Sequence, residues 1–234
     1  MRFTTSLLVA ASFISAAFGC LPARDESNTG EYPYPIIGSD EASDPATTGY
    51  FINHFSLNVK NLTRSLDFYN QIFGMRHMFT LRASEHSSIA YMAHSQAGRN
   101  GTGYQTAAEM IRDKNNMAGL VELIHMDIPG LDIPASTEKS NTFGHIGMVV
   151  PDIKATQERL ESFGVTVYKN AGDILPEEGP LVRAFAVQQM EEVYPEEYEA
   201  VLAVLNEVSK PLIFASDPDG NLIEIQVRDG PSIV

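Results

Sequence analysis

The chain has 234 residues, of which 44% are apolar, so it can bury a sizeable hydrophobic core in one large domain or two small ones. Its 16 basic and 30 acidic residues give a formal net charge of −14. This charge excludes nucleic acid as the main partner, because the phosphate backbone would repel the protein. A single cysteine, Cys20, excludes an intrachain disulfide framework and any cysteine-rich zinc site.

Residues 1–19 are typical of a secretory signal peptide. Met1-Arg2 is followed by an apolar run from Leu7 to Phe18 that contains many small residues and is too short to predict a membrane span. We therefore predict a protein that is secreted or enters the secretory pathway. Acylation of Cys20, as in a bacterial lipoprotein, and an uncleaved N-terminal anchor are the alternatives.

The segment 20–49 carries Pro, Ser, Asp, Glu and Gly with little periodicity, which predicts a flexible lead-in. The folded part is expected to start near Tyr50. Two Asn-x-Thr sequons, at Asn61 and Asn100, are candidate glycosylation sites, and they predict a glycoprotein if the host is eukaryotic.

An internal duplication organises the rest of the chain. Residues 51–59 alternate between apolar and polar side chains, which predicts a half-buried strand, and residues 143–150 repeat this alternation. An amphipathic helix follows each strand and is closed by Gly74 or Gly164. The histidines at positions 54 and 145 lie 91 residues apart. The repeat predicts two strand–helix–strand–strand–strand modules, at 50–128 and 141–230.

Each module also ends in an apolar strand with one acidic residue at its centre, Glu122 or Glu224. A carboxylate is costly in such a place unless it is paired or binds a metal. By alternation, His54, Glu122, His145 and Glu224 point away from the face that packs on the helices. If the two sheets curl together, we expect these four side chains to converge in one cleft.

Five motifs follow one another along the chain: His54-Phe-Ser-Leu-Asn-Val59, Ser65-Leu-Asp-Phe-Tyr-x-x-x-Phe-Gly-Met75, Val121-Glu-Leu123, Phe143-Gly-His-Ile-Gly147 and Asp217-Pro-Asp-Gly-Asn-Leu-Ile-Glu224. In this order they resemble glyoxalase I (lactoylglutathione lyase) of the vicinal-oxygen-chelate superfamily. The similarity covers roughly residues 50–228.

The resemblance implies an α+β fold in which two paired βαβββ modules form a curved mixed-sheet cleft. It implies one divalent metal ion, zinc or nickel, held by His54, Glu122, His145 and Glu224. Glu224 would act as the catalytic base and Glu122 would assist it.

The implied reaction converts the glutathione hemithioacetal of a 2-oxoaldehyde such as methylglyoxal to a 2-hydroxyacyl thioester, by proton transfer through an enediolate. The expected partner is a small-molecule substrate. The sequence leaves two alternatives for the cleft, because either the two modules of one chain or a second copy of the chain, in a homodimer, can complete it.

Three positions depart from the glutathione-using enzymes. Asn58 and Asn141 stand where those enzymes carry arginines, and Met126 stands where they carry an asparagine. A carboxylate needs a charge-assisted partner, which an amide does not supply. The alternatives are therefore a related metal-dependent lyase or isomerase for a non-glutathione secondary metabolite, a non-catalytic small-molecule binding protein, and an iron dioxygenase with two His and one Glu as ligands.

Residues 170–209 form an acidic insert in the second module. The insert contains nine acidic residues and one basic residue, Arg183, which leaves a net charge of −8. Residues 195–207 are predicted to be an amphipathic helix. The insert is interpreted either as a solvated acidic flap or as a lid over the metal cleft.

Overall fold

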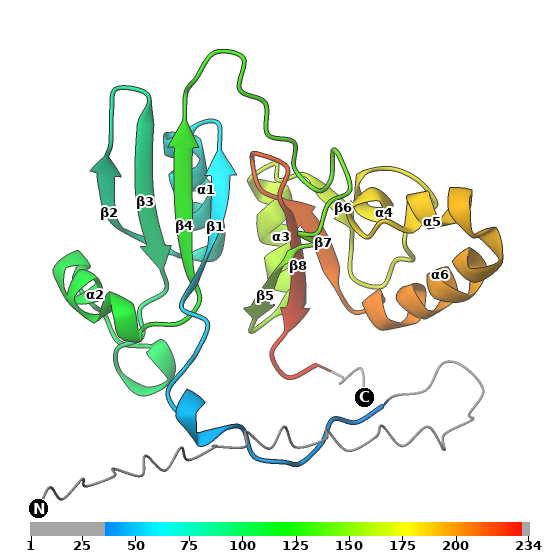
Figure 1. Cartoon of the computed structure of the whole chain (residues 1–234), viewed down its shortest axis with the longest axis horizontal. Coiled ribbons are helices and arrows are strands. Elements are labelled where there is room, and N and C mark those ends of the chain that lie inside the picture. The colour runs from blue at the N-terminus through cyan, green and yellow to red at the C-terminus, as the bar shows by residue number, and fades with distance from the viewer. Residues whose placement is uncertain (1–35, 231–234) are drawn as a thin grey trace, which may run out of the picture. The chain divides into compact units, whose positions relative to one another are not determined.

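The computed structural model describes residues 36–230 (Figure 1). The predicted signal peptide (1–19) and residues 20–35 of the predicted lead-in lie outside this range. Residues 36–49 are exposed and hold a short 3₁₀ turn, η1 (Pro45–Thr47), whose first turn is capped by the side chain of Asp44. Among the helices of the described part, none has the length and apolar character that a membrane span requires.

Two βαβββ units follow one another along the chain. The first comprises β1 (His54–Val59), α1 (Leu62–Phe73), β2 (Arg76–Arg82), β3 (Ser87–Ala93) and β4 (Leu120–Met126). The second comprises β5 (Ile146–Val150), α3 (Ile153–Ser162), β6 (Val167–Lys169), β7 (Ile213–Ser216) and β8 (Leu222–Val227).

Both units have the same topology. The strand orders are β1-β4-β3-β2 and β5-β8-β7-β6, with the first strand of each unit parallel to its last strand and the remaining pairs antiparallel. A parallel neighbour requires a crossover connection, which α1 and α3 supply. The predicted α+β class with two βαβββ units is confirmed.

Local sequence signals set the ends of the two crossover helices. Asn61 caps α1 by accepting a hydrogen bond from the backbone N–H of Arg64, and Asp152 caps α3 in the same way. Helix α1 ends at Gly74, whose φ of +70° is a left-handed conformation that glycine adopts without steric cost.

The two first strands are shorter than predicted. The strand predicted over 51–59 starts at His54, and the strand predicted over 143–150 starts at Ile146, so that His145 directly precedes it. The second difference has a local cause, because the Asn141 side chain accepts a hydrogen bond from the backbone N–H of Phe143 and holds a turn there.

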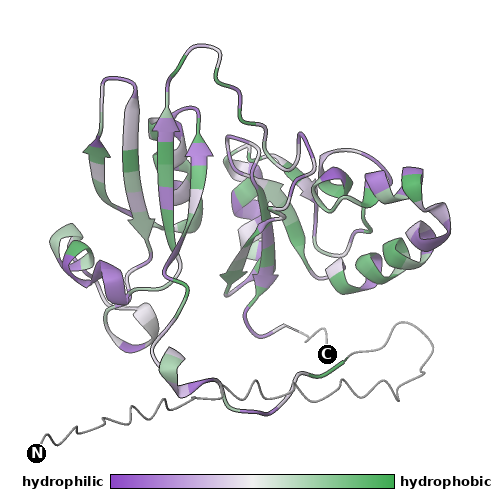
Figure 2. Cartoon of the chain, viewed as in Figure 1, coloured by the Kyte–Doolittle hydropathy of each residue, from purple (hydrophilic) through white to green (hydrophobic). Residues whose placement is uncertain are grey.

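One hydrophobic core joins the two units. Alternation along β1 buries Leu57 and Val59, while residues of β5, β7 and β8 enter the same cluster from the second unit. Figure 2 shows strands in both sheets with hydrophobic residues interrupted by hydrophilic ones. The opposite, less buried face of each sheet therefore carries the polar positions of its strands.

Each unit also carries an insertion. Between β3 and β4 lie η2 (Arg99–Gly101), α2 (Ala107–Asp113) and η3 (Lys114–Asn116). Between β6 and β7 lie α4 (Pro180–Ala184), α5 (Val187–Val193) and α6 (Pro195–Ser209), which form most of the predicted acidic insert. The helix predicted over 195–207 is present as α6.

A buried polar cluster connects α1 to the turn before β8. The Tyr69 hydroxyl donates to Asp217 Oδ2 at 3.0 Å, and the Ser65 hydroxyl donates to Asp219 Oδ2 at 3.0 Å. Asp217 also accepts hydrogen bonds from the backbone of Asp219 and from the backbone and side chain of Asn221. Burial raises the pKa of Asp217 and raises that of Tyr69 well above its usual value.

We expect Tyr69→Phe to destabilise the protein by about 1.5–3 kcal/mol, because it removes one hydrogen bond to a buried charged group. Urea denaturation at pH 7 measures this loss. The matched control is Tyr168→Phe, whose hydroxyl contacts only the neutral Ser216 hydroxyl at 3.2 Å and whose loss should cost about 0.5–1.5 kcal/mol. Equal losses in the two variants would contradict the importance of this cluster.

Candidate metal centre

The first predicted pair lies on one face of the first sheet. In the parallel pairing of β1 and β4, Ser56 is the register partner of Glu122, and His54 lies two residues before Ser56 on the same face. His54 Nε2 lies 3.9 Å from Glu122 Oε2. The Glu122 side chain is only 18% exposed, so its carboxylate is largely removed from water.

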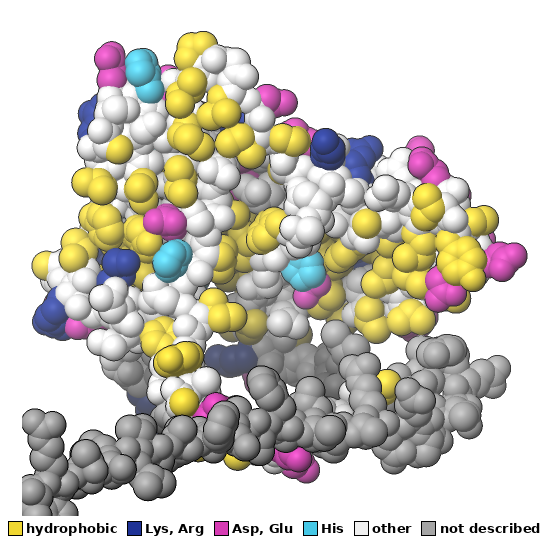
Figure 3. Space-filling view, viewed as in Figure 1, with side chains coloured by type: hydrophobic (Ala, Val, Ile, Leu, Met, Phe, Trp, Pro, Cys, Tyr) yellow, Lys and Arg dark blue, Asp and Glu magenta, His cyan; other side chains and the backbone are white. Residues whose placement is uncertain are grey.

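The second pair repeats this arrangement. Gly147 is the register partner of Glu224, and His145 lies two residues before Gly147. His145 Nε2 lies 3.4 Å from Glu224 Oε2, and the Glu224 side chain is 20% exposed. In Figure 3, histidine side chains lie beside acidic ones over each sheet. The duplicated sequence therefore produces two equivalent His–Glu pairs.

Each pair has the chemistry of half a metal centre. Two ligands bound about 2.1 Å from one ion lie about 3 Å apart when they meet at a right angle and about 3.4 Å apart at the tetrahedral angle. The second pair has the latter separation, and the first pair, at 3.9 Å, is wider. His145 Nδ1 is buried and has no hydrogen-bond partner among the described residues. An imidazole and a carboxylate at this separation fit a divalent metal ion such as zinc.

The structure does not bring the four predicted ligands together. Within residues 36–230, no group of three or more His, Cys, Asp or Glu side chains is placed to hold a metal ion. The convergence of His54, Glu122, His145 and Glu224 in one cleft of a single chain is therefore not observed. Each histidine meets the glutamate of its own sheet, because the first and last strands of a module are direct neighbours.

Asn53, which sequence reasoning missed, orients His54. Its Oδ1 lies 2.8 Å from His54 Nδ1, and its Nδ2 donates to the backbone oxygens of Lys114 and Met117. Because the Asn53 amide nitrogen is committed to those carbonyls, its oxygen accepts the Nδ1 proton of His54. This leaves the Nε2 lone pair of His54 facing Glu122, as a metal ligand requires.

Tyr91, on β3, completes the surroundings of the first pair and was also missed. It is the register partner of Glu122, and its hydroxyl lies 3.4 Å from His54 Nε2. Burial, with a smaller contribution from the neighbouring Glu122, raises the pKa of Tyr91 to about 12. Lys114 Nζ lies 4.2 Å from the centre of the Tyr91 ring. The hydroxyl is therefore a neutral hydrogen-bond donor beside Glu122 at physiological pH.

The second pair has an aromatic wall. The Phe185 ring, from the acidic insert, meets the His145 ring edge-on with centroids 5.8 Å apart and also packs against Phe214. Phe214 is the register partner of Glu224, as Tyr91 is of Glu122. The insert thus contacts a predicted metal ligand, a contact that the spacing of charged residues could not indicate.

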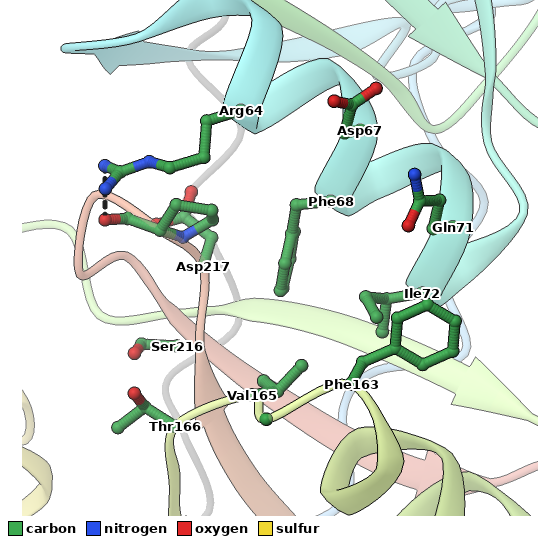
Figure 4. A pocket seen from close by; sticks show the side chains of 12 residues that line it. Arg64, Asp67, Phe68, Gln71, Ile72, Phe163, Val165, Thr166, Ser216 and Asp217 are labelled. Atoms are coloured by element: carbon green, nitrogen blue, oxygen red, sulfur yellow. Dashed lines mark hydrogen bonds between the residues drawn. The ribbon is translucent and has the colours of Figure 1, made fainter.

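Two pockets lie on different parts of the described chain. One, of about 300 Å³, is lined by α1 and the segment after α3 and contains none of the predicted ligands (Figure 4). Within it, Arg64 donates to the backbone oxygen of Pro218. The other, of about 220 Å³, lies beside β1 and is lined by both Asn58 and Asn141. Met126 shares a small adjoining pocket with Asn58.

The chain is similar to several known proteins. A lactoylglutathione lyase of Pseudomonas aeruginosa is 28% identical over 185 residues, covering 78% of this chain and 85% of that protein. The lactoylglutathione lyase of Pseudomonas putida is 28% identical over 143 residues, covering 59% of this chain and 81% of that protein. A trypanothione-dependent glyoxalase I structure from Leishmania major aligns over 76% of this chain and 86% of that one, with 17% identity and a TM-score of 0.43.

The sequence profile of the Glyoxalase/Bleomycin resistance protein/Dioxygenase superfamily matches residues 51–225, which includes all four predicted ligands. The chain belongs to this superfamily.

Proposed function

We propose that the protein is a metal-dependent lyase of glyoxalase I type that isomerises the hemithioacetal of a thiol and a 2-oxoaldehyde such as methylglyoxal. The proposal rests on the repeated His–Glu pair, which occupies equivalent register positions in the two sheets. Histidine Nε2 lies 3.9 Å from the glutamate Oε2 in the first pair and 3.4 Å in the second. The lactoylglutathione lyases of two Pseudomonas species support the reaction class.

In this proposal one divalent ion, zinc or nickel, is held by His54, Glu122, His145 and Glu224. Because the two pairs lie on separate sheets, a complete set requires the first pair of one chain to face the second pair of another. A homodimer is therefore the proposed active form. When bound, the metal would act as a Lewis acid on two neighbouring substrate oxygens and stabilise negative charge there.

The protein side chains would carry the proton. The Glu224 carboxylate takes the proton from the carbon that bears sulfur and returns it to the adjacent carbon. The hydroxyl proton on the first carbon passes to the oxygen of the second. The first carbon becomes the thioester carbonyl and the second becomes the hydroxyl-bearing carbon, so the reaction is an isomerisation. The low exposure of the Glu224 and Glu122 side chains favours this role, because it keeps bulk water away from the proton while it is transferred.

Two other functions have observations in their favour. The neutral side chains of Asn58 and Asn141 in one pocket favour a related lyase or isomerase for a non-glutathione metabolite. The separation of the two pairs in one chain suits a non-catalytic binding protein. Measuring metal content and isomerase activity in one purified preparation distinguishes the three functions.

We also propose that the protein is secreted and carries N-linked glycans. Residues 1–19 lie outside the described range, while the Asn61 side-chain oxygen caps α1 at an exposed position. Digestion of the expressed protein with an amidase specific for N-linked glycans tests the sequons at Asn61 and Asn100.

We expect His145→Ala to abolish stoichiometric metal binding, because it removes one of two imidazole ligands. Elemental analysis after dialysis measures the metal content, and circular dichroism checks that the variant folds. His125→Ala is the matched control, since His125 lies on β4 but is outside the proposed ligand set. Wild-type metal content in His145→Ala would refute the four-ligand set.

We expect Glu224→Gln to lower kcat by about a hundredfold or more while some metal stays bound, because the amide keeps an oxygen ligand but accepts no proton. Steady-state kinetics with the methylglyoxal hemithioacetal measures kcat. Glu158→Gln, on the exposed surface of α3, is the control for loss of one negative charge. Near-normal turnover with full metal occupancy would place the base elsewhere, with Glu122 as the next candidate.

We expect Asn53→Ala to weaken metal binding about 10–100-fold, because His54 loses the acceptor that holds its Nδ1 proton. Nitrogen NMR shifts of the metal-free His54 ring report the tautomer, and metal titration reports the affinity. Asn53→Asp keeps an acceptor for the Nδ1 proton but loses the donor to Lys114 and Met117, so it should retain the tautomer. An unchanged tautomer in Asn53→Ala would rule out this orienting role.

A further inference from the structure

The 220 Å³ pocket beside β1 is lined in part by residues of the same strand face as His54 of the first His–Glu pair. Ser56 and Asn58 line it, and both lie on the same face of β1 as His54, because side chains two residues apart share a face. At about 3.3 Å per residue, Ser56 lies roughly 7 Å from His54 along the strand and Asn58 roughly 13 Å. A substrate that reaches the first pair could extend directly into this pocket.

Ser56 and Asn58 are exposed and carry the uncommitted polar groups of the pocket. Within the described residues, neither side chain makes a hydrogen bond to another group of the protein. The other polar side chains in the lining are engaged. Asn141 bonds the backbone of Lys139 and Phe143, Asn221 bonds Asp217, and Ser136 bonds the backbone of Gly144. The amide of Asn58 and the hydroxyl of Ser56 can therefore each donate and accept.

The pocket supplies no positive charge. Its lining residues include no lysine, arginine or histidine, and the single ionisable one is Asp219. Arg64 pairs with Asp219 at 3.4 Å and Lys60 pairs with Asp132 at 3.8 Å, while Lys139, two residues before Asn141, is exposed and is not part of the lining. A carboxylate that entered would lose water without gaining a charge-assisted partner.

Apolar side chains form the rest of the wall. Ile133 and Phe143, from the segment between the two modules, are 39% and 37% exposed and line the pocket with Pro134. Their exposed surface suits a ligand with alkyl segments between its polar groups.

We propose that this pocket binds the uncharged, amide- and hydroxyl-bearing part of a thiol whose sulfur end reaches the His54–Glu122 pair. The proposal rests on the proposed thiol-dependent isomerase function and specifies the thiol that it uses. Glutathione, which carries two carboxylates, is then a poor ligand, and a neutral thiol such as pantetheine is a good one.

Calorimetric titration of the full-length, metal-loaded protein tests the proposal without requiring turnover. The probes are S-methyl pantetheine, S-methylglutathione and the diethyl ester of S-methylglutathione, in which both carboxylates are masked. We expect the dissociation constant of the pantetheine derivative to be about tenfold or more below that of S-methylglutathione. The diester should also bind about tenfold or more tightly than S-methylglutathione, because its carboxylates are masked.

A charge introduced at Asn58 should reverse this preference. Asn58→Arg supplies the missing cation, so the ratio of the two dissociation constants should shift by about tenfold or more toward S-methylglutathione. Ser162→Arg adds the same charge at an exposed position on α3 and should leave the ratio unchanged. Circular dichroism establishes that both variants fold.

The outcomes separate this proposal from the proposed function. Equal or tighter binding of S-methylglutathione to the wild type, or no binding of any probe, overturns the neutral-thiol pocket. An unchanged ratio in Asn58→Arg also overturns it. Pantetheine binding without isomerase activity on any methylglyoxal hemithioacetal supports the pocket and overturns the enzyme assignment.

Discussion

A carboxylate at the centre of an apolar strand must find a polar partner, and this requirement determines how each module works. Glu122 and Glu224 each lie between buried neighbours on β4 and β8. The parallel pairing of the first strand with the last brings a histidine to the same face in both modules. The crossover helix makes this pairing possible, since parallel neighbours cannot be joined by a tight turn. The βαβββ topology is therefore the scaffold of one His–Glu pair.

Alternation and duplication carry enough information to predict this scaffold from the sequence. A period of two assigns His54 and Leu57 to opposite faces of β1, and the repeat transfers the assignment to the second module. Neither the alternation nor the duplication predicts how far apart side chains on different sheets lie. The pairing of each histidine with the glutamate of its own module follows from topology. The meeting of the two pairs depends on how whole sheets are arranged, which local periodicity does not encode.

The neighbours of the two pairs differ although the pairs themselves are repeated. Asn53 precedes the first histidine and bonds its ring, whereas Gly144 precedes the second, whose Nδ1 lacks a partner among the described residues. A tyrosine, Tyr91, faces the first glutamate, and a phenylalanine, Phe214, faces the second. The first pair is thus supported by polar groups and the second by aromatic ones. The repeat does not predict these differences. Asn53 is held by the backbone oxygens of Lys114 and Met117, and His145 meets Phe185, and these groups come from the segments inserted between the repeated strands.

The acidic insert is exposed to solvent at its charged positions and contacts one of the predicted ligands. All nine of its acidic residues are exposed, so their charges are screened by solvent and act on the site only through a general field. Its specific contribution to the site is the contact of the Phe185 ring with the His145 ring. Two features hold the Phe185 ring in place. Lys169 Nζ donates to the backbone oxygens of Asn170 and Ser209 and so ties the two ends of the insert together. Ala186, directly after Phe185, adopts a left-handed φ of 58°, a conformation that costs about 1–2 kcal/mol and persists only where the surrounding packing requires it.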